Sequence, residues 1–386
     1  ASAGFLTGKD AVVTILYTND VHTYIDNKSP KLTYAAIAAM KQGYVDEGKP
    51  VLLVDAGDHI QGTAYGSMDN GATIIELMNE AGYDIATLGN HEFDYGMARA
   101  KAIIKEADFP YVSCNWVDLR TGLRVLPAVK LFPAGGKWIA FVGITTPESF
   151  TKSTPAYFMN AKQTKYIYDI LGGDDGRKLY DAVQKAIDKA KTLGADIIIG
   201  LGHLGVDPSS SPWTSEEVIA NTTGFDAFID GHSHSTFSET IKDKSGKEVV
   251  FEQTGTKLAN VGKIIIKADG TITHENVDLN TVEPDAEAAA YIQTITDKFD
   301  ALQKQVVAKT SVELTINGAD GKRAVRNAET NLGDLCADAY RILLGADIAF
   351  VNGGGVRDNI KVGDITYGDI IKVHPFGNEA CLVEVT

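Results

Sequence analysis

Short apolar runs of Val, Ile and Leu recur along the first part of the chain and alternate with longer amphipathic stretches. The longer stretches, such as residues 31–48 and 177–194, carry apolar residues at helical spacing with charged residues between them. Strands that alternate with helices predict a layered α/β domain. The expected strands lie near residues 12–19, 51–57, 84–88, 111–115, 138–144, 196–202 and 226–230.

The pattern changes further along the chain. Residues 251–279 show the shorter period of paired strands, which we expect to close the edge of the α/β domain. Residues 285–308 return to helical spacing and predict one long helix that joins two domains; a coiled coil is the alternative, but the run is short for one. Residues 151–176 are longer than an ordinary connection and predict a surface insertion.

Polar residues with metal-binding chemistry follow one of the expected strands. Residues 83–88 end at Gly89. Asn90 and His91 come directly afterwards, which is the usual position for ligands in an open α/β sheet. The Asn90 carbonyl can bind a divalent metal while His91, held in one tautomer by Asp94, stays free to donate a proton. By itself this segment also fits a polar turn whose Asn caps a helix.

Four further segments deliver similar side chains directly after apolar runs. Each one alone is compatible with a core histidine or a helix cap, but five such segments together favour a metal centre. We expect all five to meet at the same end of one sheet. The side chains of the four further segments are Asp20 and His22, Asp58, His203, and His232 with His234.

The ligand chemistry narrows the kind of site. A mixed set of imidazole, amide and carboxylate ligands without cysteine suits two divalent ions such as Zn, Mn, Fe, Co or Ni. Seven ligands exceed one tetrahedral site but match two sites that share a bridging carboxylate. Two adjacent cations can clamp a phosphoryl oxygen and activate water for an in-line displacement. The residues therefore predict a two-metal phosphoesterase.

The motifs D-x-H, G-D-x-x-Q-G, G-N-H-E-x-D, G-H and G-H-S-H occur in this order and resemble those of the calcineurin-like metallophosphoesterases. More closely, the chain looks like the secreted bacterial 5′-nucleotidase and 2′,3′-cyclic-nucleotide 2′-phosphodiesterase family. The resemblance implies an α/β domain of two facing sheets flanked by helices, with His91 and Asp94 as a catalytic dyad. It implies one metal held by Asp20, His22, Asp58 and His234, and a second held by Asp58, Asn90, His203 and His232.

One ligand departs from the family pattern. Relatives carry Gln or Asn where this chain has His234. An imidazole can still coordinate a divalent ion, but the metal preference is expected to shift.

Three motifs in the last part of the chain resemble the beginning of the family's substrate-binding domain. They are R-N-A-E-T-N-L-G from Arg326, V-N-G-G-G-V-R across residues 351–357, and H-P-F-G-N from His374. The resemblance implies that Arg326 and Arg357 contact an anionic group such as phosphate, that Asn352 bonds the base and that Phe376 stacks on it. Read alone, a triple-glycine turn is as often only a tight loop, and an aromatic residue beside proline is more often core.

The length of 386 residues exceeds what one core usually holds and predicts two domains. The resemblance divides the chain into a catalytic domain at residues 1–282, a linker helix at 283–308 and a partial α+β substrate-binding domain at 309–386. This last domain is shorter than its counterpart in the family. We expect it to need a missing C-terminal fragment or a neighbouring chain to cover its strands.

Charge and cysteine content exclude some classes of partner. The net charge is −15 and no basic run occurs, so a long nucleic acid is not an expected partner, whereas a small nucleotide is. No apolar run is long enough to span a bilayer. The three cysteines cannot all pair, and no disulfide framework is expected. A secreted, periplasmic or cell-surface location is implied by the resemblance alone, and a cytosolic location stays open.

The implied activity is the release of phosphate from nucleoside 5′-monophosphates, together with the opening of 2′,3′-cyclic nucleotides. A nucleotide-sugar or dinucleotide pyrophosphohydrolase, a nuclease, and a non-catalytic surface metal-binding protein are the alternatives. The presence of both His91 and Asp94 favours an enzyme, and the acidic charge disfavours the nuclease.

Overall fold

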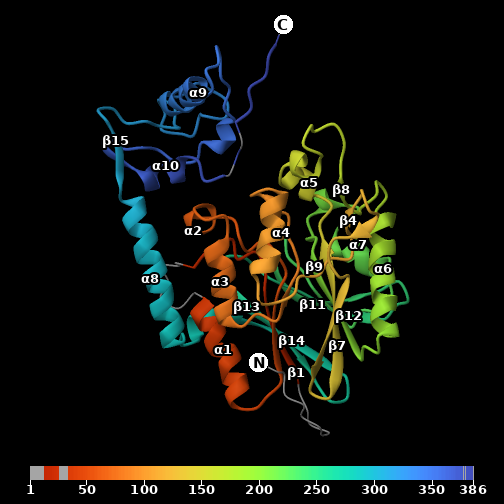
Figure 1. Ribbon diagram of the computed structural model, residues 1–386. Helices are drawn as coiled ribbons and strands as arrows, with labels where there is room; N and C mark the ends of the chain where they lie inside the picture. Colours follow the sequence, from red (N-terminus) through yellow and green to blue (C-terminus); the bar gives the residue numbers. More distant parts are fainter. Residues whose placement is uncertain (1–12, 26–33, 377, 379, 386) are drawn as a thin grey trace. The chain divides into compact units, whose positions relative to one another are not determined.

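Figure 1 shows the computed structural model, which describes residues 13–25, 34–376, 378 and 380–385. The chain folds into two compact units. The first unit contains the described residues up to Gln61 and those of Met68–Ile292; the second contains Gly62–Ser67 and the described residues from Gln293 onward. Within the described ranges, no helix is both long and apolar enough to cross a membrane.

Two sheets form the centre of the first unit. One has the strand order β14-β13-β1-β2-β3 and the other has the order β11-β12-β10-β9-β7-β6. In the first sheet β1, β2 and β3 run parallel, and in the second β7, β9, β10 and β12 do. The bounds in the first sheet are β1 Val13–Thr18, β2 Val51–Asp55, β3 Ile85–Ala86, β13 Asn260–Ile266 and β14 Ile272–Asp278. Those in the second are β6 Val129–Ala134, β7 Lys137–Thr145, β9 Ile197–His203, β10 Ala227–Ile229, β11 Thr236–Lys242 and β12 Glu248–Thr254.

The main core of the first unit lies between these two sheets. Val54 of β2 and Ile199 of β9 belong to one buried cluster, so the sheets face each other as the resemblance implied. The opposite face of the second sheet packs against α6 (Arg177–Thr192), where Val183 shares a second buried cluster with Phe228. Because the central strands are covered on both faces, their sequences read as nearly continuous apolar runs.

The helices predicted over residues 31–48 and 177–194 are confirmed as α1 and α6, although residues 31–33 lie outside the described ranges. Local capping explains some boundaries. Thr214 and Glu217 form a capping box at the start of α7, so two free backbone N–H groups gain partners. Besides α6, the α-helices that lie wholly in the first unit are α1 Tyr34–Asp46, α3 Ala72–Ala81, α4 Met97–Glu106, α5 Ser149–Lys152 and α7 Ser215–Ala220. Its short 3-10 helices are η1 His91–Phe93, η2 Pro155–Phe158, η3 Pro208–Ser210 and η4 Leu279–Thr281.

Three details differ from the expectations. Residues 111–115 do not form a strand, and only Tyr111 makes a bridge to Ala86. Residues 151–176 are not a simple surface insertion, because β8 (Tyr168–Ile170) joins a three-stranded sheet with β4 (Trp116–Asp118) and β5 (Leu123–Arg124). Some apolar side chains of that segment are buried, and the Phe158 ring lies against the Phe93 ring with centroids 4.9 Å apart.

The third difference concerns residues 251–279, which are divided between the two sheets. β13 and β14 close the edge of the first sheet as expected, whereas β12 pairs with β10 and β11 in the second sheet. The crossing occurs near Gly255, which has φ 79° and so adopts a left-handed conformation. A pairing pattern in the sequence indicates strands but does not say which sheet each strand joins.

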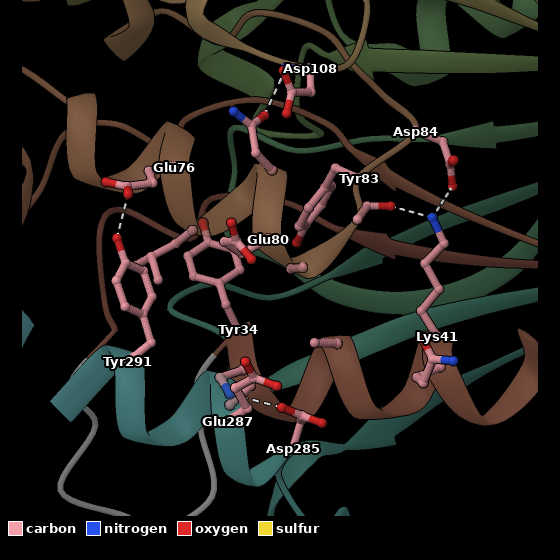
Figure 2. A pocket seen from close by; sticks show the side chains of 18 of the residues that line it. Tyr34, Lys41, Glu76, Glu80, Tyr83, Asp84, Asp108, Asp285, Glu287 and Tyr291 are labelled. Carbon is pink, nitrogen blue, oxygen red and sulfur yellow. Dashed lines mark hydrogen bonds and ion pairs between the residues drawn. The ribbon is translucent and has the colours of Figure 1, made fainter. Parts of the chain in front are cut away.

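A hollow bordered by α1, α3 and the first turns of α8 (Ala286–Gln303) is lined by several carboxylates (Figure 2). Polar contacts tie its walls together. Lys41 donates to the Gly82 carbonyl and lies 2.8 Å from an Asp84 oxygen, and the Tyr291 hydroxyl is 2.5 Å from a Glu76 oxygen. None of the predicted metal ligands lines this hollow, so it is separate from the candidate site.

The second unit is smaller and its core is built from few side chains. Leu314, Leu332, Val356 and Ile365 belong to its buried cluster. The long helix α8 begins close to its predicted start but ends at Gln303, before the predicted end at residue 308; its residues 286–292 belong to the first unit and those from Gln293 onward to the second. The elements of the second unit are α2 Ala64–Ser67, β15 Val306–Thr310, α9 Asn331–Leu344, η5 Gly353–Gly355, β16 Gly363–Thr366 and α10 Tyr367–Val373, with β15 and β16 antiparallel. Cys114, Cys336 and Cys381 are all free.

Glu252 on β12 is a buried carboxylate in the first unit. One of its oxygens accepts a hydrogen bond from the Ser238 hydroxyl at 2.6 Å and lies 3.2 Å from His274 Nδ1. Burial raises the pKa of Glu252 to about 8, and the hydrogen bond from Ser238 opposes this only in part. The carboxyl is therefore mostly protonated in the folded protein at neutral pH.

The free energy of unfolding of the wild-type protein is expected to fall as pH rises. Replacing Glu252 with Gln is expected to abolish the part of this fall that Glu252 causes. The folded pKa lies above the ordinary value of 4.5, so the folded state binds the proton more tightly. The stabilisation is complete below pH 4.5 and falls as pH rises through the folded pKa of about 8. Urea unfolding at several pH values across that window measures the effect. Glu239 is an exposed carboxylate on β11, and Glu239→Gln should keep the wild-type slope of unfolding free energy against pH. The same slope in Glu252→Gln and Glu239→Gln would contradict the prediction.

Candidate metal centre

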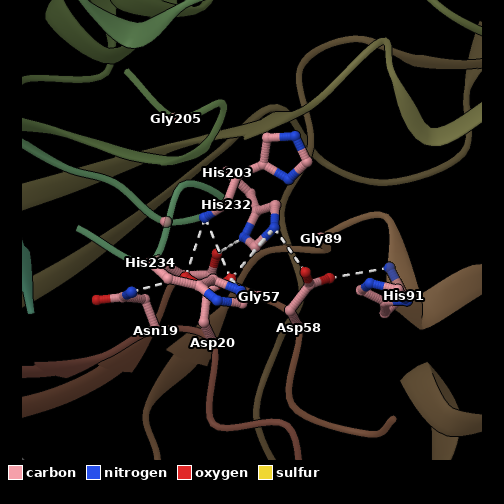
Figure 3. Close-up of polar contacts among 12 residues, drawn as sticks. Asn19, Asp20, Gly57, Asp58, Gly89, His91, His203, Gly205, His232 and His234 are labelled. Atoms are coloured by element: carbon pink, nitrogen blue, oxygen red, sulfur yellow. Dashed lines mark hydrogen bonds and ion pairs between the residues drawn. The ribbon is translucent and has the colours of Figure 1, made fainter. Parts of the chain in front are cut away.

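The candidate ligands come from the carboxyl ends of parallel strands in both sheets. Asp20 follows β1 and Asp58 follows β2, while His203 ends β9 and His232 follows β10. The expectation of one sheet is therefore wrong: two facing sheets contribute, and their strand ends converge (Figure 3). Convergence from both sheets surrounds the site with ligands on more than one side, which a single sheet edge does not do.

The backbone is strained at most of these positions. Five of the predicted ligands have positive φ, which costs roughly 1–3 kcal/mol for a residue other than glycine. Such strain persists only when the surrounding structure enforces it, and it concentrates at functional sites. The five are Asp20 (50°), His22 (51°), Asp58 (60°), His232 (80°) and His234 (56°).

Asp20, His22 and His234 form one group that could hold a metal ion. His22 Nδ1 lies 2.9 Å from the Gln61 carbonyl, to which it donates, and this leaves Nε2 with its lone pair toward the group. His22 Nε2 is 3.0 Å from His234 Nε2, and His234 Nε2 is 3.4 Å from an Asp20 oxygen. Burial lowers the pKa of His22, which favours the neutral imidazole that a metal requires.

Asp58, His203 and His232 form the second group. His203 Nδ1 lies 2.7 Å from the Ala56 carbonyl and donates to it, so Nε2 faces Asp58 Oδ2 at 3.0 Å. Burial alone lowers the pKa of His203, but the charges of Asp58 and Asp20 raise it well above the ordinary value. His203 Nε2 and Asp58 Oδ2 both carry lone pairs, so a positive charge between them stabilises the contact. In the metal-free protein this charge is a proton, and a bound metal would replace it.

The residues present fit two divalent cations. The buried Asn90 Oδ1 has no hydrogen-bond partner among the described residues, and the buried His203 Nε2 faces the carboxylate oxygens of Asp58 and Asp20. A buried acceptor without a partner is costly, and a cation bound by Asn90 would satisfy it. Asp58 Oδ2 also lies 3.9 Å from His22 Nε2, so one carboxylate reaches toward both groups.

Gly89 leaves the space that Asp58 fills. A Cβ at Gly89 would lie 2.1 Å from Asp58 Oδ1 and 2.7 Å from the Asp58 backbone nitrogen. Both atoms belong to the ligand segment, so the clash cannot be relieved by moving a flexible surface side chain.

Gly89→Ala is therefore expected to lower the affinity for metal by about tenfold or more, because it displaces a ligand. Metal content after dialysis against a fixed free metal concentration measures this. Gly43→Ala is the matched control, since a Cβ at Gly43 of α1 meets nothing within 4 Å. Unchanged metal content in Gly89→Ala would show that Asp58 can shift without cost.

The structure brings His91 and Asp94 together as the sequence predicted. His91 Nδ1 lies 2.6 Å from Asp94 Oδ2, and Ser153 donates to the other Asp94 oxygen at 2.7 Å. The backbone N–H of His91 donates to Asp58 Oδ1 at 2.8 Å, which ties the dyad to the ligand segment. Burial lowers the pKa of His91, but the charges of Asp58 and Asp94 raise it to about 9.

Sequence reasoning gave no role to Glu92, although it stands inside the G-N-H-E motif. Its buried carboxylate accepts from the backbone N–H groups of Asp58, His59 and Gly89 at 2.8, 2.8 and 2.6 Å. Glu92 therefore joins the segment after β2 to the segment after β3. The only signal in the sequence was an acidic residue between His91 and Asp94, which does not reveal its partners.

Comparison with known proteins places this site in a family. The sequence profile described as calcineurin-like phosphoesterase matches residues 13–236. The chain belongs to this family. A second profile, described as the 5′-nucleotidase C-terminal domain, matches residues 306–386. Calcineurin-like metallophosphoesterases use two divalent metal ions, in agreement with the two ligand groups.

Several relatives of this calcineurin-like phosphoesterase are known. The endonuclease YhcR of Bacillus subtilis is 28% identical over 409 residues, which cover 96% of this chain and 32% of YhcR. Protein UshA of Escherichia coli is 28% identical over 418 residues, covering 97% of this chain and 74% of UshA. The crystal structure of the 5′-nucleotidase precursor from Thermus thermophilus matches with a TM-score of 0.69 at 27% identity, covering 95% of this chain and 74% of that one. This calcineurin-like phosphoesterase thus spans about a third of YhcR.

The predicted substrate residues of this calcineurin-like phosphoesterase lie in the second unit, around the turn at Gly353–Gly355. Asn352 Oδ1 accepts from the Gly354 N–H at 3.0 Å, and Arg357 donates to the Gly354 carbonyl at 3.2 Å. The Arg357 guanidinium lies 5.8 Å from the centre of the Phe376 ring. Arg326, Asn352, Arg357 and Phe376 are all exposed. Gly377, which belongs to the H-P-F-G-N motif with Phe376, lies outside the described residues.

Proposed function

We propose that this chain hydrolyses phosphate esters of nucleotides at a two-metal centre. The observation that carries the proposal is the placement of two ligand groups beside the His91–Asp94 pair. When bound, the two cations would supply Lewis acidity to the phosphoryl group and activate water as the nucleophile. The family and the 5′-nucleotidase C-terminal domain support the same reaction class.

We propose that each of the predicted ligands serves one of two sites. Asp20, His22 and His234 would hold one cation through atoms that already face one another. Asn90, His203 and His232 would hold the second, and Asp58 would serve both sites, as the resemblance implies; its Oδ2 lies 3.0 Å from His203 Nε2 and 3.9 Å from His22 Nε2. His234 supplies an imidazole where relatives were expected to carry an amide, so the first site has one more nitrogen ligand.

His91 would act as the proton donor. Asp94 accepts the proton on His91 Nδ1, so the second ring nitrogen is the one that can hold a proton for the leaving alkoxide. In the metal-free protein the charges of Asp58 and Asp94 raise the pKa of His91 to about 9; cations on Asp58 would offset the first charge, whereas the hydrogen bond to Asp94 would still favour the protonated ring. Ser153 holds Asp94 in place and thereby limits the orientations of the imidazole.

We propose that the second unit recognises the nucleoside and an anionic group. A guanidinium matches phosphate geometry, and an exposed aromatic ring offers a face to any nucleobase. Arg326 and Arg357 would contact the anion, Asn352 would bond the base and Phe376 would stack on it. The exposure of all four side chains, grouped near one glycine turn, supports this reading over a purely structural one.

Phosphate release over a panel of substrates tests the proposal. The panel contains nucleoside 5′-monophosphates, 2′,3′-cyclic nucleotides, UDP-sugars, dinucleotides, single-stranded DNA and a simple aryl phosphate, each with Zn, Mn or Co. We expect nucleoside 5′-monophosphates to be the best substrates, followed by the cyclic nucleotides. Highest activity on UDP-sugars or dinucleotides would favour a pyrophosphohydrolase, on DNA a nuclease, and no turnover with full metal content a metal-binding protein.

Phe376→Ala separates recognition from chemistry. It is expected to raise KM for nucleotides by about 5- to 100-fold, because base stacking is worth about 1–3 kcal/mol. The aryl phosphate should react with unchanged kcat and KM, since it has no base to stack. An equal effect on both substrates would remove Phe376 from nucleoside recognition.

We infer that further polypeptide covers an apolar face of the second unit. Ile348 and Phe350 are 71% and 93% exposed, and Leu382 and Val383 are 66% and 72% exposed. Within the described residues, the backbones of 347–351 and 381–385 make no hydrogen bonds. Unpaired apolar segments of this kind are a template for strand addition.

Hydrogen exchange tests this inference. In the chain as it stands, amides of residues 347–351 are expected to exchange within seconds, as for solvent-exposed amides. Addition of a polypeptide that carries the rest of the family's C-terminal domain should slow their exchange. Full protection of these amides in a monodisperse monomer would contradict the inference.

We further propose that the protein acts outside the cytoplasm. The support is the similarity to enzymes such as UshA, which are periplasmic or cell-surface proteins. Fractionation of the source cells with an antibody against this chain tests the location, and recovery in the cytosol alone would contradict it.

A further inference from the structure

Glu148 makes a contact with a predicted metal ligand that neither the motifs nor the comparisons assign. It follows β7 on the T-T-P-E-S segment, just before α5. Its Oε2 lies 2.8 Å from His232 Nε2 and 2.7 Å from the Ser210 hydroxyl. The two side chains of the Glu148–His232 pair are only 11% and 10% exposed. The contact is therefore well shielded from water, unlike an ordinary surface ion pair.

The donor and acceptor roles in this contact follow from simple chemistry. Ser210 donates its hydroxyl proton to Glu148 Oε2, and an ionised carboxylate can only accept. His232 Nε2 must therefore carry the proton in its bond to the same oxygen. In the neutral ring this leaves Nδ1 as the atom with a free lone pair. His232 can then offer only Nδ1 to the group that it shares with Asp58 and His203.

The other buried imidazoles of the centre are held in the opposite sense. His22 and His203 are tied through Nδ1 to the carbonyls of Gln61 and Ala56, so both present Nε2. His232 stands beside His203, with ring centroids 5.2 Å apart and the planes inclined by 58° (Figure 3). Two rings on adjacent strand ends thus point different nitrogens at one position. In each ring, one nitrogen donates its proton to an acceptor outside the ligand group, and the other nitrogen is therefore the one that faces the metal position.

We infer that Glu148 is a positioning residue that orients His232 for metal binding through Nδ1. It acts from outside the ligand set, with Ser210 fixing the carboxylate oxygen that receives the His232 proton. Carboxylates that accept from the second nitrogen of a ligand histidine hold the ring and increase its basicity. This inference rests on the proposed metal centre, but it concerns ligand geometry and not turnover.

The experiment uses the full chain loaded with Co²⁺, whose paramagnetism shifts the N–H protons of coordinating imidazoles to separate NMR signals. The N–H of His232 should be visible because Glu148 shields it from exchange. In Glu148→Ala this signal is expected to broaden or vanish through solvent exchange. The N–H signals of His22 and His203, which are held by carbonyls, should persist and serve as internal controls. Assignment comes from the spectrum of His232→Gln.

Metal affinity gives a second readout. Competition with a chromophoric chelator is expected to show that Glu148→Ala weakens one of the two Zn²⁺ sites by about 10- to 100-fold and leaves the other unchanged. Glu148→Gln keeps side-chain volume and an acceptor oxygen, so it should retain the His232 N–H signal and lose less affinity. Asp207→Asn is the matched control, because it removes an exposed carboxylate near Ser210 while an amide can still cap the turn.

Three results would overturn the inference. The first is an unchanged His232 signal and unchanged affinity in Glu148→Ala. The second is an equal loss of affinity in Asp207→Asn, which would indicate a general effect of charge. The third is loss of one metal from Glu148→Ala with the His232 signal intact, which would make Glu148 itself a ligand. Neither the NMR signal nor the metal affinity depends on turnover. Absence of phosphatase activity would therefore count against the proposed function without affecting the test of Glu148.

Discussion

Replacing His91 with Ala is expected to lower kcat by about 10²–10⁴ for nucleotide substrates, with metal content unchanged. His91 would supply the proton for the leaving alkoxide, and its side chain faces the ligands without belonging to either ligand group. The loss should be smaller for an aryl phosphate, because a phenolate leaves without a proton more readily than a sugar alkoxide. Steady-state kinetics on both substrates, with metal analysis of each preparation, measures the effect.

Asp94→Asn is the companion variant. It keeps the size of the side chain that meets His91 Nδ1, yet it removes the charge that holds the ring in one orientation. We expect an intermediate loss of kcat with KM unchanged. Equal turnover in wild type and His91→Ala would remove His91 from the chemistry.

Asp58→Ala is expected to reduce activity to background and to abolish binding of at least one metal. Asp58 Oδ2 lies 3.0 Å from His203 Nε2 and 3.9 Å from His22 Nε2, whereas Asp20 Oδ1 lies 3.8 Å from each of these two atoms, so Asp58 is the carboxylate with the shorter contact to the second group. Wild-type protein should gain about 2.7 kcal/mol of unfolding free energy at a free metal concentration 100 times the dissociation constant. The variant should gain much less. Thermal unfolding with and without added Mn²⁺ measures this difference.

Asp118→Asn provides the control, because Asp118 pairs with Arg120 at 2.7 Å and belongs to neither ligand group. It should keep the wild-type response to metal. If Asp58→Ala retained both metals and the full thermal shift, the bridging role of Asp58 would be wrong, and the two groups would have to bind their cations independently.

Much of the fold followed from local patterns. The apolar runs near residues 51–57 and 196–202 became β2 and β9, because buried parallel strands need continuous apolar sequence. Residues 111–115 are also buried but form only one bridge, at Tyr111. A short apolar run shows that a segment is buried, and its neighbours in space decide whether it is paired. The same reason explains why β12 joined the second sheet and β13 the first.

For the site, the residue types and their order along the chain were enough to indicate the chemistry. Aspartate, asparagine and histidine each follow a strand end, and parallel strands bring such ends together. The tautomers of the histidines could not be predicted in this way. Each depends on an acceptor distant in sequence, such as Ala56 for His203 or Glu148 for His232.

The sequence by itself determined the candidate ligands, because side-chain chemistry is a property of each residue and strand ends can be read from local pattern. It also indicated the His91–Asp94 pair, because three positions separate these residues and one short turn brings them together. Only the tertiary structure decided that two sheets share the site, that Glu92 links two ligand segments and that Glu148 stands behind His232. Those contacts join residues far apart in the chain, and hydrogen-bond partners at such separations are set by packing and not by local sequence.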